Sequence, residues 1–121
     1  MRALVVDDSK MVQVILGNSL KEIGFEVFDA GHGGEAMAHL RAHGLVDLML
    51  VDWNMPVMNG YELVCAVRAV SLLKSIRIMR ITTETSLTNV ELALAADAND
   101  YLMKPFTKEQ LLEKLTLLGL N

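Results

Sequence analysis

The sequence has few cysteines, few prolines and few aromatic residues. Its 121 residues include one cysteine, Cys65, and two prolines, and aromatic residues make up 5%. A single cysteine excludes an internal disulfide and is typical of a reducing compartment. No apolar run approaches the roughly 20 residues that a membrane-spanning helix needs. Acidic side chains appear too early in the N-terminal stretch for a secretory signal. We therefore expect a cytoplasmic protein without membrane insertion.

Positive charge is also scarce. Lys and Arg number 11 against 15 Asp and Glu, which gives a net charge of −4. Nucleic-acid binding relies on basic patches, so this balance argues against direct binding of DNA or RNA. Apolar residues make up 52% and charged residues 21%, a composition typical of a folded globular chain. The length predicts one domain over residues 1–121.

Short apolar runs alternate with longer amphipathic stretches along the chain. The pattern predicts strands at residues 3–6, 25–28, 48–51, 76–81 and 101–103, each followed by a helix. Ser9 is suited to cap the first helix, Gly24 to end it, and Thr107 with Gln110 to form a capping box before the last. Five such repeats predict an α/β fold, a parallel sheet with helices on both faces.

Helical spacing also predicts which side chains face the core. In the first helix, the expected inward face consists of Val12, Ile15, Leu16, Leu20 and Ile23. Cys65 is expected on the inward side of its helix. His39 and His43 lie four residues apart, with Glu35 one turn earlier, as metal ligands can, but no fourth ligand is evident. We expect both histidines on a solvated face.

Polar residues follow four of the predicted strands. Asp7 and Asp8 follow the first strand, Asp52 the third, Thr82 the fourth and Lys104 the fifth. Ligands of open α/β sheets bind beyond the carboxyl ends of the strands, so these side chains are expected at one edge. Three converging carboxylates repel one another unless a cation intervenes, and Mg²⁺ suits such oxygen ligands. A carboxylate can then accept a phosphoryl group, stabilised by the ammonium and the hydroxyl.

Four segments of the chain resemble the signatures of response-regulator receiver domains, in the same order and at the same spacing. They are Leu4-Val5-Val6-Asp7-Asp8-Ser9, Val51-Asp52-Trp53-Asn54-Met55-Pro56, Ile81-Thr82-Thr83 and Lys104-Pro105-Phe106. The resemblance covers the whole chain and is strongest, in its motifs, to single-domain chemotaxis regulators of the CheY type. It implies a flavodoxin-like (βα)5 fold, with the five-stranded parallel sheet in the order 2-1-3-4-5.

The same resemblance implies a role for each site residue. Asp52 is the implied phosphoacceptor, and Thr82 and Lys104 contact the phosphoryl group. Thr82 and Tyr101 are the implied switch residues. The implied Mg²⁺ ligands are Asp7, Asp8, Asp52 and the backbone carbonyl of Asn54. Phosphorylation by a sensor histidine kinase or a phosphotransfer protein then changes the surface of the fourth helix, fifth strand and fifth helix, which controls a downstream protein target or an output domain.

Other functions are possible for such a chain. It can be the receiver piece of a longer regulator, such as a DNA-binding transcription factor or a hybrid kinase. A haloacid-dehalogenase-type phosphatase also uses an aspartyl nucleophile, but it needs a second acid where this chain has Asn54. A flavin-binding module is disfavoured because Asp7 and Asp8 would repel a flavin phosphate. We therefore expect a switch rather than a turnover enzyme.

The chain departs from the pattern of receiver domains at two positions. Arg80 lies within a predicted strand, where the family usually has an apolar residue. Its guanidinium is expected either to reach solvent along its stem or to pair with an acid. Asp97 stands where glycine is common, so the fourth helix is expected to end differently. Both departures fall near the expected output surface and leave the partner open.

Overall fold

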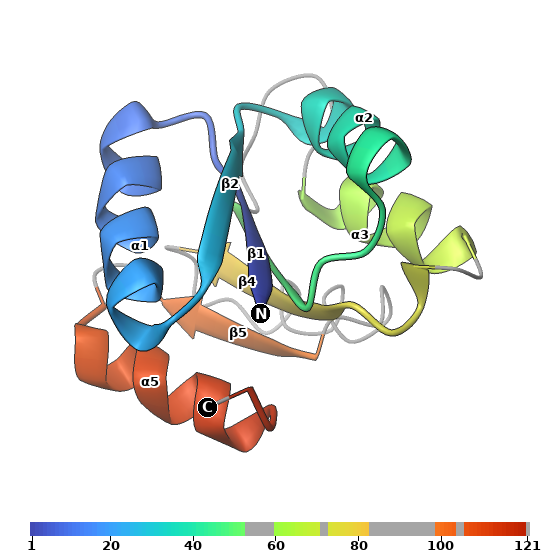
Figure 1. Ribbon diagram of the computed structural model, residues 1–121. Coiled ribbons are helices and arrows are strands. Elements are labelled where there is room, and N and C mark those ends of the chain that lie inside the picture. The colour runs from blue at the N-terminus through green and yellow to red at the C-terminus, as the bar shows by residue number, and fades with distance from the viewer. Residues whose placement is uncertain (53–59, 71–72, 83–98, 104–105, 121) are drawn as a thin grey trace.

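The computed structural model describes residues 1–52, 60–70, 73–82, 99–103 and 106–120 (Figure 1). The strands are β1 (Arg2–Val6), β2 (Glu26–Ala30), β3 (Leu48–Asp52), β4 (Arg77–Thr82) and β5 (Asp100–Met103). The helices are α1 (Lys10–Ile23), α2 (Gly33–His43), α3 (Gly60–Ala69) and α5 (Lys108–Leu117). The five predicted strands are all found, with ends that differ by at most two residues. The expected fourth helix, around 86–96, lies outside the described residues, as does Asp97.

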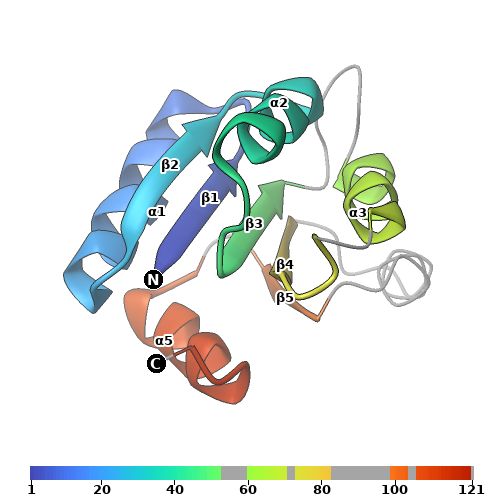
Figure 2. The same ribbon diagram turned by 45° about the vertical axis from the view of Figure 1, so that its right-hand side comes forward.

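All strand pairs in the sheet are parallel, in the order β2-β1-β3-β4-β5. The predicted flavodoxin-like order is therefore confirmed. Helices α1 and α5 lie on one face of the sheet and α2 and α3 on the other (Figures 1 and 2). Because the order reverses between β1 and β3, the carboxyl ends of these two neighbouring strands open onto the crevice where ligands of such sheets bind.

The central strands are buried on both faces. The side chains of 3–6 in β1 and 48–51 in β3 are 0% exposed. Leu4 and Met49 belong to the apolar cluster beneath α2 and α3, whereas Val5 and Leu50 belong to the cluster beneath α1 and α5. Alternate residues thus feed two separate cores, which explains why these strands are apolar without alternation. The two cores hold β1 and β3 rigidly beneath the crevice.

The predicted helix caps are confirmed. The Ser9 side chain accepts a hydrogen bond from Val12 N, and Gly24 ends α1 with a φ of 116°. That left-handed conformation favours glycine because it has no Cβ. Before α5, Thr107 Oγ1 accepts from Gln110 N at 3.1 Å, and Thr107 N donates to Gln110 Oε1 at 2.9 Å. None of the described helices is long and apolar enough to cross a membrane.

Three predictions about helix faces are wrong. Ile15 is 51% exposed, because the buried stripe of α1 runs through residues 13, 16, 17 and 20 instead. Cys65 is exposed, since the buried stripe of α3 contains Leu63, Val64 and Val67. His43 is exposed as expected, but His39 is half-buried: its ring packs 4.9 Å from that of Phe28 and 4.6 Å from that of His43, centroid to centroid.

Candidate functional site

Three carboxylates meet at the carboxyl ends of β1 and β3. Asp7 and Asp8 directly follow β1, and Asp52 is the last residue of β3. The two strands are hydrogen-bonded neighbours, with Val6 opposite Val51. One carboxylate oxygen from each aspartate lies within 4.8 Å of the others. The structure therefore brings together three of the residues expected at this edge.

The three carboxylates differ in their surroundings. Asp7 is 1% exposed and Asp52 is 6% exposed, whereas Asp8 is open to solvent. The Oδ1 atom of Asp7 accepts a hydrogen bond of 2.8 Å from Ser9 N, so its side chain is oriented by the turn that opens α1. Two buried acids and one exposed acid therefore form a negatively charged cluster at this edge of the sheet.

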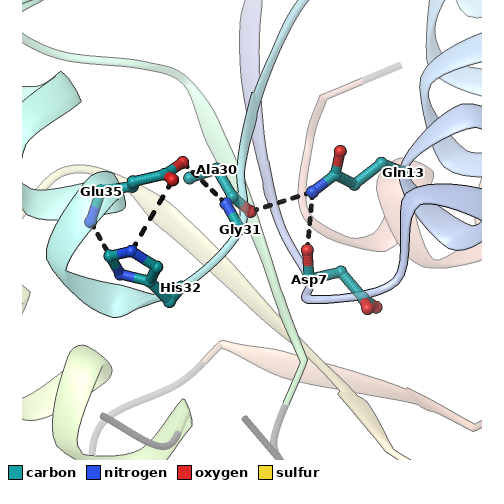
Figure 3. Close-up of polar contacts among 6 residues, drawn as sticks. All are labelled: Asp7, Gln13, Ala30, Gly31, His32 and Glu35. Atoms are coloured by element: carbon teal, nitrogen blue, oxygen red, sulfur yellow. Dashed lines mark hydrogen bonds and ion pairs between the residues drawn. The ribbon is translucent and has the colours of Figure 1, made fainter. Parts of the chain in front are cut away.

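Gln13 anchors the backbone beneath this cluster, and sequence reasoning missed it. Its Nε2 atom donates to Asp7 O at 2.7 Å and to Ala30 O at 3.4 Å (Figure 3). Asp7 N also donates to Ala30 O, at 3.0 Å. Gln13 is 6% exposed, so its amide joins the ends of β1 and β2 inside the protein. The sequence feature that could have indicated its burial is its helical spacing from Leu16 and Leu20, which places Gln13 on the same face as these apolar residues.

The turn between β2 and α2 forms the neighbouring wall. His32 caps α2, with its Nδ1 accepting from Glu35 N at 3.2 Å, and Glu35 Oε2 accepts from Gly31 N at 3.0 Å (Figure 3). Beside this turn lies a polar hollow of about 240 Å³. It is lined by Asp8, Lys10, Gln13, Asp29, Gly31 and Glu35.

The aspartate cluster fits a small divalent cation. An octahedral Mg²⁺ has Mg–O distances of about 2.1 Å, so oxygens in its shell are at most roughly 4.2 Å apart. The oxygens of Asp7, Asp8 and Asp52, within 4.8 Å of one another, meet this requirement after small side-chain adjustments. Hard oxygen ligands of this kind favour Mg²⁺ over softer metals. The cluster can therefore hold a metal ion, while Asn54 lies outside the described residues.

The other expected site residues are described only in part. Ile81 pairs with Asp52, so the backbone of Thr82 lies one residue beyond Asp52 at the same edge. The side chain of Thr82 and all of Lys104 lie outside the described residues. Tyr101 is in β5, opposite Arg80 and 41% exposed, away from the aspartates. Of the two alternatives for Arg80, a guanidinium that reaches solvent is wrong, because the residue is only 1% exposed. Pairing with an acid stays a prediction.

The sequence matches the family model of the response regulator receiver domain over residues 3–116. The chain belongs to this family. Receiver domains are signalling proteins rather than classical turnover enzymes, and Mg²⁺ and a phosphorylated aspartate are typical of them. The resemblance expected from the four motifs is therefore confirmed.

Chemotaxis regulators are among the similar receiver proteins. The chain is 46% identical to chemotaxis protein CheY1 of Helicobacter pylori, over 100% of this chain and 99% of that protein. It is 44% identical to a CheY homolog of Campylobacter jejuni, over 95% of this chain and 89% of that protein. The solved structure of chemotaxis protein CheY4 of Vibrio cholerae superimposes with a TM-score of 0.90 at 39% identity, covering 96% of each chain. The expected likeness to CheY-type regulators is confirmed.

Proposed function

We propose that the chain is a phosphorylation switch and that Asp52 is its phosphoacceptor. The observation that carries the proposal is the convergence of Asp7, Asp8 and Asp52 within 4.8 Å. Of the three, Asp52 is the last residue of the central strand β3. It pairs with Ile81 of β4, so Thr82 lies one residue further along the same edge. Asp8 is exposed, which makes it less suited to the fixed position that in-line attack needs.

The proposed reaction transfers a phosphoryl group from a phosphohistidine of a sensor kinase or phosphotransfer protein. A carboxylate oxygen of Asp52 forms a bond to phosphorus while the nitrogen–phosphorus bond of the donor breaks. The donor imidazole keeps the electron pair of that bond and takes up a proton. The product is an acyl phosphate on Asp52, and hydrolysis returns the carboxylate and inorganic phosphate.

The residues around Asp52 prepare it for a negatively charged donor. Asp7, Asp8, Asp52 and the backbone carbonyl of Asn54 would hold Mg²⁺, which supplies positive charge for the phosphoryl oxygens. Gln13 fixes the backbone of Asp7 through its 2.7 Å hydrogen bond. Thr82 and Lys104 are proposed to contact the phosphoryl oxygens through a hydroxyl and an ammonium, which stabilise charge without covalent chemistry.

The proposed output is a change of surface at β5 and α5. When the hydroxyl of Thr82 turns toward the phosphoryl group, Tyr101 is proposed to change rotamer and alter the surface that a downstream protein reads. Membership of the receiver family supports two kinds of partner, a histidine kinase upstream and a target protein downstream. The similarity to chemotaxis proteins supports a chemotaxis target and action in the cytoplasm.

Phosphorylation of Asp52 can be tested with a small donor. The wild-type protein, incubated with acetyl phosphate and Mg²⁺, is expected to gain one phosphoryl group by intact-mass spectrometry, and excess chelator should prevent this. Asp52→Asn should gain none. Asp29→Asn is the matched control, because Asp29 is an exposed acid of β2 outside the cluster. Uptake by Asp52→Asn at the wild-type rate would show that another residue is the acceptor.

A further inference from the structure

Arg80 is a buried cation within β4, between the buried apolar residues Met79 and Ile81. It is 1% exposed and the largest fully buried side chain among the described residues. In the sheet it lies between Val51 of β3 and Tyr101 of β5. Its alternate neighbour Ile78 faces the cluster beneath α2 and α3, so Arg80 projects from that same face of β4. Its place in the sheet makes Tyr101 its direct cross-strand neighbour.

Two cations contact the ring of Tyr101. The guanidinium carbon of Arg80 lies 5.8 Å from the ring centroid, and Lys114 Nζ of α5 lies 4.6 Å from it. Lys114 is held in place by an ion pair of 3.0 Å with Asp100 Oδ1. The same Oδ1 atom accepts a hydrogen bond of 2.8 Å from Tyr101 N. The tyrosine is thus fixed at its backbone by Asp100 and at its ring by two positive charges.

The two cations differ in how strongly they can act. A buried guanidinium loses its hydration and gains correspondingly from an aromatic face, which arginine stacks on well. Lys114 is 28% exposed in its side chain, so water weakens its attraction to the ring. Arg80 therefore contributes more to holding the ring in its present, half-exposed position.

We propose that Arg80 is a positioning residue for the switch, and that it stabilises the outward conformation of Tyr101 in the resting protein. The inference rests on the proposed function in one respect, the role of Tyr101 in output. Replacing Arg80 by methionine removes the cation and shortens the side chain beneath the ring. Both changes favour rotation of Tyr101 toward the vacated interior. Removing a cation–π contact of this kind should change the ratio of the two rotamers about two- to thirtyfold.

The test measures the χ1 populations of Tyr101 from three-bond scalar couplings in the unphosphorylated full chain. The chain has only one other tyrosine, Tyr61, so Tyr61→Phe assigns the signals. Arg80→Met should increase the ratio of inward to outward rotamers by about two- to thirtyfold. Arg77→Met is the matched control, because Arg77 is an exposed arginine of the same strand, and it should change nothing. Lys114→Met should give a smaller shift in the same direction.

A second variant covers the case in which Arg80→Met does not fold. Arg80→Lys keeps a buried cation but loses the planar guanidinium, and it should shift the rotamers in the same direction to a smaller extent. Unchanged Tyr101 populations in the folded variant, or a shift outward, would overturn the proposal. Because these populations are measured without phosphorylation, failure of Asp52 to accept a phosphoryl group would leave this result standing. That separate failure would refute the proposed function alone.

Discussion

Neutralising Asp52 should stabilise the fold while it abolishes phosphorylation. Its carboxylate lies within 4.8 Å of those of Asp7 and Asp8, and like charges this close oppose folding. One pair of unit charges at that distance repels by about 0.9 kcal/mol in a water-like dielectric and by about 3.5 kcal/mol at an effective dielectric constant of 20. Asparagine has nearly the same shape as aspartate, so Asp52→Asn removes two such repulsions without creating a cavity.

The expected gain in unfolding free energy for Asp52→Asn lies between the values for these two dielectric constants. Asp8 is exposed, so solvent screens its repulsion, whereas buried Asp7 acts more strongly. Asp52 also has a further polar or electrostatic interaction, and its loss reduces the gain. We expect the free energy of unfolding to rise by about 1–3 kcal/mol in the absence of divalent metal. Functional carboxylates commonly reduce stability in this way.

Urea unfolding, followed by far-ultraviolet circular dichroism, measures the effect in chelator and in Mg²⁺. With Mg²⁺ at ten times its dissociation constant, the wild type should gain about 1.4 kcal/mol through linkage. Asp52→Asn should gain much less, because it has lost a charged ligand. Asp29→Asn, outside the cluster, should stay within about 0.5 kcal/mol of the wild type. If Asp52→Asn is no more stable than the wild type in chelator, repulsion within the cluster does not govern its stability.

Two other substitutions test the surroundings of the site. Gln13→Ala leaves the buried carbonyls of Asp7 and Ala30 without its amide donor, which should cost about 1–3 kcal/mol of unfolding free energy and weaken Mg²⁺ binding followed by Trp53 fluorescence. Unchanged Mg²⁺ affinity in this variant would show that Gln13 does not contribute to metal binding. Burial, His43 and Arg2 lower the pKa of His39 below 6.5 in the folded protein. The folded state therefore binds fewer protons than the unfolded chain, and stability should fall as pH drops through about 6.5. In His39→Leu, the free energy of unfolding measured in urea should depend less on pH. An unchanged pH dependence would show that His39 does not cause the loss of stability.

The sequence alone was sufficient for the strands, their order in the sheet and the helix caps. Buried parallel strands need apolar residues on both faces, so the segments that became β1 and β3 could be recognised locally. Helix ends depend on side chains within a few positions, which made Ser9, Gly24 and the Thr107–Gln110 box predictable. The carboxylates could be placed together because parallel strands deliver their carboxyl ends to one edge. Each of these inferences uses only neighbours along the chain or a rule of sheet topology.

Only the tertiary structure decided which side chains are covered. Ile15 and Gln13 are two positions apart on α1, yet the polar residue is buried and the apolar one is exposed. The reason is that the ends of β1 and β2 present carbonyl oxygens to Gln13, and no sequence pattern reveals where those carbonyls lie. Arg80 is buried for a comparable reason. Its strand is closed in by β3 and β5, and the ring of Tyr101 offers its guanidinium a favourable contact across the sheet.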